Sequence, residues 1–177
     1  ELLFEDPATA PNEEGVLVID EHGDRKWGKK TAHVGKQYLG GIGKTENGVV
    51  SVSSLYADER LYYPLEVEPY TPAHHFEGGK TDPAFRTKPH IALQLVERAI
   101  EMELPFRAVV GDILYGEHRK FKEGLEEKGI PYVLSLKPSH AWWHPIDEVG
   151  WEEGVAQGAY WNAPDDPGEW VELERRF

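Results

Sequence analysis

Two short apolar runs, each followed directly by an aspartate, constrain the fold of this chain more than any other feature. They are Gly15-Val-Leu-Val-Ile-Asp20 and Phe106-Arg-Ala-Val-Val-Gly-Asp112, and both predict buried strands that end at the edge of a sheet. If neighbouring strands bring the two carboxylates together, these repel each other unless a cation neutralises them. Mg²⁺ is commonly held by one or two carboxylates together with water and phosphate oxygens. The pattern therefore indicates metal-assisted phosphoryl chemistry.

The composition fits one domain without cysteine chemistry. Of the 177 residues 40% are hydrophobic, which suffices for a core, and the absence of cysteine excludes disulfides and thiolate zinc sites. No apolar run approaches the roughly 20 residues of a membrane span, and no signal-peptide pattern opens the chain. We expect a soluble, cytoplasmic protein without a membrane partner. Because the chain starts at Glu1 and stops at Phe177 within a charged run, we also expect a segment of a longer protein.

The net charge of −13 disfavours a phosphate-bearing partner, but the acids concentrate at the two ends. Residues 1–14 carry five acids and no Lys or Arg, and residues 145–177 carry nine acids and two Arg, which leaves −1 for residues 15–144. Residues 21–44 hold two acids and six basic side chains: Arg25, Lys26, Lys29, Lys30, Lys36 and Lys44. A solvated loop explains this basic strip as well as a phosphate-binding surface does, and only its position after Asp20 favours the latter.

Hydrophobic periodicity predicts three meandering strands, then alternating helices and strands. The predicted strands are residues 16–20, 49–57 and 60–70, with an irregular strand in 33–43, a charged turn at 21–30 and a hairpin at Asn47-Gly48. After a Pro- and Gly-rich loop come a helix at 89–103, a strand at 106–111, a helix at 117–128 ended by Gly129, and a strand at 132–136.

This order predicts an α/β fold in which parallel strands extend an antiparallel hairpin. The arrangement is that of the ribonuclease H-like mixed sheet, where the first strand lies beside the strand after the first helix. We therefore expect Asp20 and Asp112 to be neighbours. We assign residues 1–14 to a linker, 15–139 to a partial ribonuclease H-like core, and 140–177, which hold five of the six tryptophans, to the start of an incomplete β-rich insertion.

Several motifs, taken in order over residues 15–140, resemble the DDE-type transposases of bacterial and archaeal insertion sequences. They are Val18-Ile-Asp20-Glu-His-Gly-Asp-Arg-Lys-Trp-Gly-Lys-Lys30, His33-Val-Gly-Lys-Gln-Tyr38, Gly40-Gly-Ile-Gly-Lys44, Phe85-Arg-Thr-Lys-Pro89, Val109-Val-Gly-Asp112-Ile-Leu-Tyr-Gly116 and Gly129-Ile-Pro-Tyr-Val-Leu134. Each motif alone is weak, and their common order makes the resemblance specific.

The resemblance implies a catalytic core that holds two Mg²⁺ ions, with Mn²⁺ as a substitute, on an Asp-Asp-Glu triad. Asp20 matches the first acid and Asp112 the second. The family pattern has a second small acid or Thr where Glu21 and His22 stand, which leaves the role of Glu21 open. The third acid would lie on a helix beyond Phe177. Within the chain only elimination offers candidates, and we favour none of them: Glu148, Glu152, Glu153, Glu172 and Glu174.

The implied reaction is an in-line displacement at phosphorus, first by water at a transposon end and then by the freed 3′-hydroxyl on target DNA. Lys29, Lys30 and Lys36 would contact the phosphates of double-stranded DNA, with Arg86 and Lys88 as further candidates. The resemblance further implies a homodimer that bridges two transposon ends in the nucleoid region of a prokaryotic cell.

Other interpretations remain beside this one. A phosphatase with a strand-end Asp nucleophile would need a second Asp where His22 stands, whereas a resolvase or ribonuclease H could use the same sheet. A truncated copy could bind DNA or a full-length partner without cutting. Zinc at His74-His75 or at His140 and His144 has little support, and for the second pair no helix signal favours ligation by residues i and i+4. The tryptophans of residues 142–170 could stack on bases, but a small β core explains them better.

Overall fold

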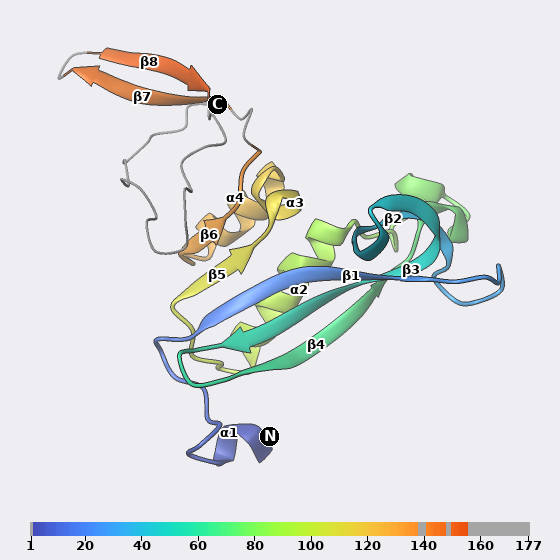
Figure 1. Ribbon diagram of the computed structural model, residues 1–177, viewed down its shortest axis with the longest axis horizontal. Helices are drawn as coiled ribbons and strands as arrows, with labels where there is room; N and C mark the ends of the chain where they lie inside the picture. Colours follow the sequence, from blue (N-terminus) through green and yellow to red (C-terminus); the bar gives the residue numbers. More distant parts are fainter. Residues whose placement is uncertain (1, 138–140, 148–149, 156–177) are drawn as a thin grey trace. The chain divides into compact units, whose positions relative to one another are not determined.

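The computed structural model describes residues 2–137, 141–147 and 150–155, and the chain divides into two compact units, Glu1–Leu134 and Ser135–Phe177. Among the described residues, no helix is long and apolar enough to cross a bilayer. The first unit is a mixed α/β domain built on a six-stranded sheet (Figure 1). The predicted α/β class is therefore confirmed.

The sheet has a central parallel pair and an antiparallel half. β1 lies between β3, to which it is antiparallel, and β5, to which it is parallel, and β6 continues the parallel half beyond β5. β2 and β4 both pair with the other edge of the long β3, one near its start and the other along its end. The strands are β1 (Val16–Arg25), β2 (Gly35–Leu39), β3 (Lys44–Ala57), β4 (Tyr62–Tyr70), β5 (Ala108–Gly111) and β6 (Tyr132–Leu134).

One face of the sheet carries the hydrophobic core. Alternate residues of β1, Leu17 and Ile19, are fully buried and pack with apolar residues of α2 and α4. The helix α2 runs along this face (Figure 1). Thr87 accepts a hydrogen bond from the N–H of His90 at its start, and Pro89 lies in its first turn, as the sequence predicts. The helices are α1 (Leu2–Glu5), α2 (Lys88–Glu101), α3 (Ile113–Gly116) and α4 (Arg119–Glu127), and three 3₁₀ turns are η1 (Gly40–Ile42), η2 (Ala73–His75) and η3 (Gly79–Thr81).

The opposite face of the sheet is more exposed. Residues paired in register share a face of the sheet, so Val18 lies on the same face as Val110 and Val133. Asp20, two residues after Val18, lies on this face too, with its partners Ser53 and Val67. Val67 and Val133 are each 61% exposed. The face that carries Asp20 is thus distinct from the face packed against α2.

Two local predictions in the antiparallel half are wrong. β1 does not end at Asp20 but runs to Arg25, because the long β3 supplies partners up to the pair of Arg25 with Gly48. Asn47-Gly48 is no hairpin and lies inside β3, while the turn between β2 and β3 is formed by η1 and Gly43, whose φ is 64°. Gly48 is needed because a Cβ there would lie 2.5 Å from the Asp24 carbonyl oxygen.

The parallel half follows the prediction more closely. The strands near residues 106–111 and 132–136 and the helix near 89–103 are confirmed with slightly shorter bounds. The predicted helix at 117–128 is α4, and the short α3 before it was not predicted. α3 forms because the Asp112 side chain accepts a hydrogen bond from the Leu114 N–H and so caps it.

The described part of the second unit is an antiparallel hairpin of β7 (Ala141–Asp147) and β8 (Gly150–Val155). It is β structure, as expected there, and the assignment of residues 140–177 to an insertion stays a prediction. Some sequence candidates lie outside the described residues: His140, Glu148, Trp161, Trp170, Glu172 and Glu174.

Candidate functional site

The two strand aspartates occupy equivalent places on neighbouring strands. The parallel pairing of β1 with β5 ends at Ile19 and Gly111, and Asp20 and Asp112 directly follow these two residues in the chain. Asp112 keeps an extended backbone, with φ −81° and ψ −171°, although β5 has ended. Neighbouring strands lie about 4.7–4.9 Å apart. Both side chains are exposed, so the two carboxylates start from adjacent backbone positions at the surface.

Each carboxylate is held by one local hydrogen bond and keeps further acceptor capacity. Asp20 Oδ1 accepts from the N–H of Glu21 at 2.7 Å, and Asp112 Oδ1 accepts from the N–H of Leu114 at 2.9 Å. Within the described part of the chain, neither aspartate forms an ion pair with a Lys or Arg side chain. An exposed carboxylate pair without a protein cation is a suitable ligand set for a hard divalent cation.

The pair is not a complete metal cage. Among the residues that the structure describes, no group of three or more His, Asp or Glu side chains is placed to hold a metal ion. Glu21 does not supply the third ligand, because it follows Asp20 in a strand and points to the opposite face. There its Oε1 lies 2.9 Å from the Lys88 Nζ of α2.

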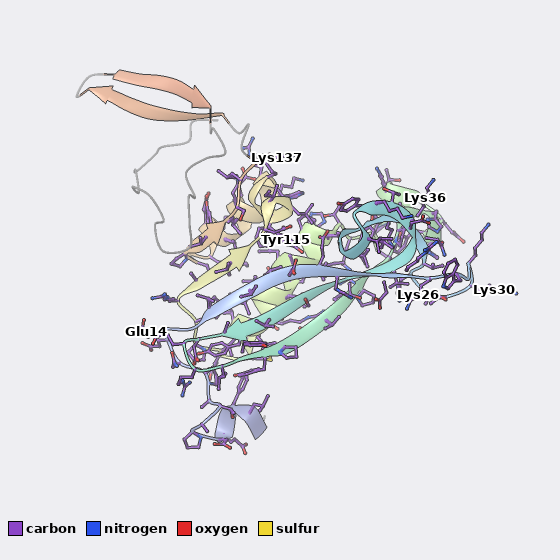
Figure 2. The ribbon with its side chains drawn as sticks, in the orientation of Figure 1. Glu14, Lys26, Lys30, Lys36, Tyr115 and Lys137 are labelled. Atoms are coloured by element: carbon purple, nitrogen blue, oxygen red, sulfur yellow. The ribbon has the colours of Figure 1, made fainter. Side chains whose placement is uncertain are left out.

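A buried tyrosine lies beside the acids and was missed by the sequence reasoning. Tyr115 on α3 is fully buried, and neither its hydroxyl nor the buried Oε2 of Glu21 has a hydrogen-bond partner among the residues that the structure describes. Burial raises the pKa of Tyr115, and the charges of Glu21, Asp112 and Asp20 raise it further. Figure 2 labels Tyr115, on the short helix that follows β5. The phenol therefore stays protonated at neutral pH beside three acids.

The predicted DNA-binding cations fall into two groups. Lys29, Lys30 and Lys36 are exposed and make no ion pair with any described residue, and Figure 2 shows Lys30 on the loop after β1, away from Tyr115. Arg86 instead contacts Glu68 and Gln94, each at 2.7 Å. Lys88 is 19% exposed and paired with Glu21. The structure thus uses Arg86 and Lys88 in internal ion pairs, and Lys88 meets Glu21 on the sheet face opposite Asp20.

A groove lies at the start of α2. It encloses about 340 Å³ and is lined by Lys36, Gln37, Tyr38, Tyr70, Pro72, Thr87, Lys88, Pro89 and Leu114. Leu114 connects it to the pair, since its N–H is the hydrogen-bond donor to Asp112. The sequence offered no signal for this groove, because its residues come from β2, β4, α2 and α3.

The fold and the site together define a mixed α/β domain in which two aspartates follow the last parallel pair of β1 and β5, neither of them ion-paired with a described Lys or Arg. A family model described as DDE superfamily endonuclease matches residues 2–176. The chain belongs to this family.

A relative from Microchaete diplosiphon, described as "Probable transposase for insertion sequence element IS701", is 38% identical over 126 residues, which make up 71% of this chain. The chain spans only 32% of that relative's length. Two solved structures of Ppx/GppA proteins from Aquifex aeolicus match 71% and 70% of the chain and 36% of their own chains, at 10% and 12% identity. Their TM-scores of 0.28 are too low to support an argument about fold or function.

Proposed function

We propose that this chain is part of the catalytic domain of an insertion-sequence transposase, which cuts DNA strands and joins 3′-hydroxyls to target DNA. The observation that carries the proposal is the position of Asp20 and Asp112 directly after the last parallel pair of β1 and β5, where no described Lys or Arg forms an ion pair with either acid. The family membership and the printed name of the relative support it. The strand arrangement, with β1 between antiparallel β3 and parallel β5, is the one expected of a ribonuclease H-like sheet.

Asp20 and Asp112 would hold Mg²⁺, or Mn²⁺ in its place. The donor set fits, because both groups are exposed carboxylates, each with one oxygen that has no hydrogen-bond partner among the described residues. When bound, such ions activate the attacking oxygen and stabilise the leaving oxygen of the displacement. Backbone hydrogen bonds from Glu21 and Leu114 fix the two side chains. We propose that a third carboxylate comes from a segment beyond Phe177.

A second candidate is DNA binding without cleavage by this segment alone. It is favoured by the lack of a third metal-ligating side chain near the aspartate pair among the described residues. In both cases Lys29, Lys30 and Lys36 would contact the phosphates of double-stranded DNA, which carry no sequence information. A homodimer would bring two DNA ends together.

The acid pair is tested by Asp20→Asn and Asp112→Asn in the full-length protein. We expect each to reduce cleavage of DNA carrying the element's ends by at least about a hundredfold, because metal stabilisation of such a displacement amounts to several kcal/mol. Asn still caps a helix, so α3 should stay intact. Binding of Mn²⁺, followed by electron paramagnetic resonance, should weaken in parallel. Asp24→Asn, which removes the same charge from an exposed position of β1, is the matched control. Normal cleavage by either variant would disprove the assignment.

The basic strip is tested by the salt dependence of duplex binding. Replacing both Lys29 and Lys30 with Gln should weaken binding at low salt and reduce the slope of log K against log salt by about 1.8, since each phosphate contact contributes about 0.9. Lys44→Gln is the control, because Lys44 is already paired with Glu46 at 3.1 Å. An unchanged slope in the double variant would place the phosphate contacts elsewhere.

A further inference from the structure

The ion pair between Glu21 and Lys88 lies where β1 loses one of its neighbouring strands. The parallel pairing with β5 ends at Ile19, and from Asp20 to Arg25 the strand pairs, within the described part of the chain, only with β3. The Oε1 of Glu21 lies 2.9 Å from the Nζ of Lys88 on the face that α2 covers. A side chain of α2 therefore contacts β1 at the point where β5 no longer supports it.

Both partners of the ion pair are largely shielded from water. The side chains of Lys88 and Glu21 are 19% and 22% exposed, and the Nζ of Lys88 also lies 6.0 Å from the centre of the Tyr70 ring. Salt screens a partly buried pair much less than an exposed one. This pair therefore holds its two side chains together more firmly than an exposed pair such as Lys44 with Glu46.

The place of Lys88 in its helix is unfavourable by itself. Lys88 is the first residue of α2, and the first turn of this helix holds no acidic side chain. The N-terminal end of a helix carries partial positive charge, so a cation there is repelled. Glu21 supplies from the sheet the negative charge that the start of the helix lacks. The stability of the helix alone thus does not explain a lysine at this position, whereas a role toward Glu21 does.

Glu21 connects Lys88 to the first acid of the candidate site. Its backbone N–H donates to Asp20 Oδ1 at 2.7 Å, while Lys88 holds its side chain on the other face of the sheet. Lys88 also neutralises the charge of Glu21, so this acid does not add its repulsion to that between Asp20 and Asp112. Lys88 is thereby linked through one residue to the Asp20 carboxylate, although it lies on the opposite face.

We infer that Lys88 is a positioning residue for Asp20. By binding the Glu21 side chain, it fixes the β1 backbone at Glu21 and with it the N–H that orients the Asp20 carboxylate for metal binding. The inference rests on the proposed function, since it assumes that Asp20 holds a divalent cation. It adds that Lys88 acts through Glu21 and does not contact the phosphates of DNA.

The test measures Mn²⁺ binding to variants of the full-length protein by electron paramagnetic resonance. Lys88→Met should weaken Mn²⁺ binding about tenfold or more, since the loss of a side chain that orients a metal ligand commonly has an effect of this size. Lys88→Arg should bind Mn²⁺ more tightly than Lys88→Met, because a cation still reaches Glu21. Glu21→Gln keeps the side-chain volume, leaves no unpaired carboxylate and should also weaken binding. Should Lys88→Met not fold, Glu21→Gln decides the test.

Arg98→Met is the matched control. Arg98 also joins α2 to the sheet, but its partners are Glu66 at 3.2 Å and Glu68 at 3.4 Å, both of which belong to β4. Loss of this ion pair should lower the Tm, as loss of the Lys88 ion pair does, while leaving Mn²⁺ affinity unchanged.

Three results would overturn the inference. The first is normal Mn²⁺ binding by both Lys88→Met and Glu21→Gln, and the second is an equal loss in Arg98→Met. The third is a Lys88→Met variant that binds Mn²⁺ normally but lowers the slope of log K against log salt for duplex DNA by about 0.9, the value of one phosphate contact. In each case the proposed function stands as long as Asp20→Asn weakens Mn²⁺ binding. Unchanged binding in Asp20→Asn would overturn both.

Discussion

The sheet carries carboxylates in two places that differ in burial and in hydrogen bonding. One is Asp58, and the other is the pair Asp20 and Asp112. The Asp58 side chain, just after β3, is only 3% exposed and forms an ion pair with Arg60 at 2.8 Å. It also accepts hydrogen bonds from the Tyr56 hydroxyl, the Asn12 amide and the backbone N–H groups of Arg60 and Leu61. Both of its oxygens are engaged, so it has no capacity left for a cation.

Asp20 and Asp112 are exposed and accept one local backbone hydrogen bond each. We expect acceptor capacity, rather than the mere presence of an acid, to distinguish the proposed binding site from the structural carboxylate of Asp58. The size of a hollow does not distinguish them. A larger hollow of about 570 Å³ lies beside Asp58, where Glu13, Glu14 and Glu59 would repel phosphate.

The largest effect on stability is expected from Asp58→Asn. The hydrogen bonds and charge of Arg60 hold the pKa of Asp58 well below its usual range. A lowered folded-state pKa stabilises the fold above the unfolded value of about 3.9, and this contribution is lost as the pH falls from there toward the folded-state pKa. Asp58→Asn should therefore lower the Tm by several degrees at pH 7. The difference from the unmodified protein should shrink at pH 3.

Glu59→Gln is the control for this prediction, because Glu59 is its exposed neighbour and should change the Tm little at either pH. Differential scanning calorimetry at pH 7 and pH 3 measures both variants. A Tm difference for Asp58→Asn that is the same at both pH values would mean that the ionised carboxylate is not what stabilises this end of the sheet.

The sequence predicts those parts of the fold that depend on local pattern. The helix α2, predicted from its amphipathic spacing, is confirmed, and so are the strands β1 and β5, predicted from their apolar runs. The parallel pairing of β1 with β5 is confirmed as well. Asn47-Gly48 was misassigned because a hairpin dipeptide is a local signal, whereas here β1 and β2 pair with β3 on both sides at Gly48. Asn47 instead donates to the Lys26 and Gly28 carbonyl oxygens and holds the loop after β1. Such long-range pairing overrides a turn preference of this kind.

The residues of the candidate site likewise divide into those that the sequence predicts and those that only the packing reveals. Asp20 and Asp112 could be proposed from sequence, because each follows an apolar run. Tyr115 and the pairing of Glu21 with Lys88 could not, since their environment depends on how α2 and α3 pack on the sheet. A single tyrosine three residues after Asp112 carries no sequence signal of burial beside three acids. Polar atoms without partners become visible only when the packing is known.

Two buried tyrosines allow the same comparison between a polar group with hydrogen-bond partners and one without, here for a single hydroxyl. The expected effects on stability are smaller than for Asp58→Asn. Tyr56 and Tyr115 are both fully buried, and burial raises the pKa of each, so both are protonated at neutral pH. The Tyr56 hydroxyl accepts from the Asn12 N–H at 2.8 Å and donates to Asp58 at 3.0 Å. The Tyr115 hydroxyl has no partner among the described residues.

Tyr56→Phe should therefore lower the free energy of unfolding by about 1 kcal/mol, because it removes the hydrogen bonds of this hydroxyl with the Asn12 N–H and with Asp58. Tyr115→Phe removes an unsatisfied group and should leave the free energy of unfolding unchanged or raise it by up to about 1 kcal/mol. Urea unfolding of the two variants measures both values with the same chemical change. If Tyr115→Phe destabilises the protein as much as Tyr56→Phe, the Tyr115 hydroxyl has a partner in solution. The capacity for further hydrogen bonds beside Asp20 and Asp112 would then be limited to the two carboxylates themselves.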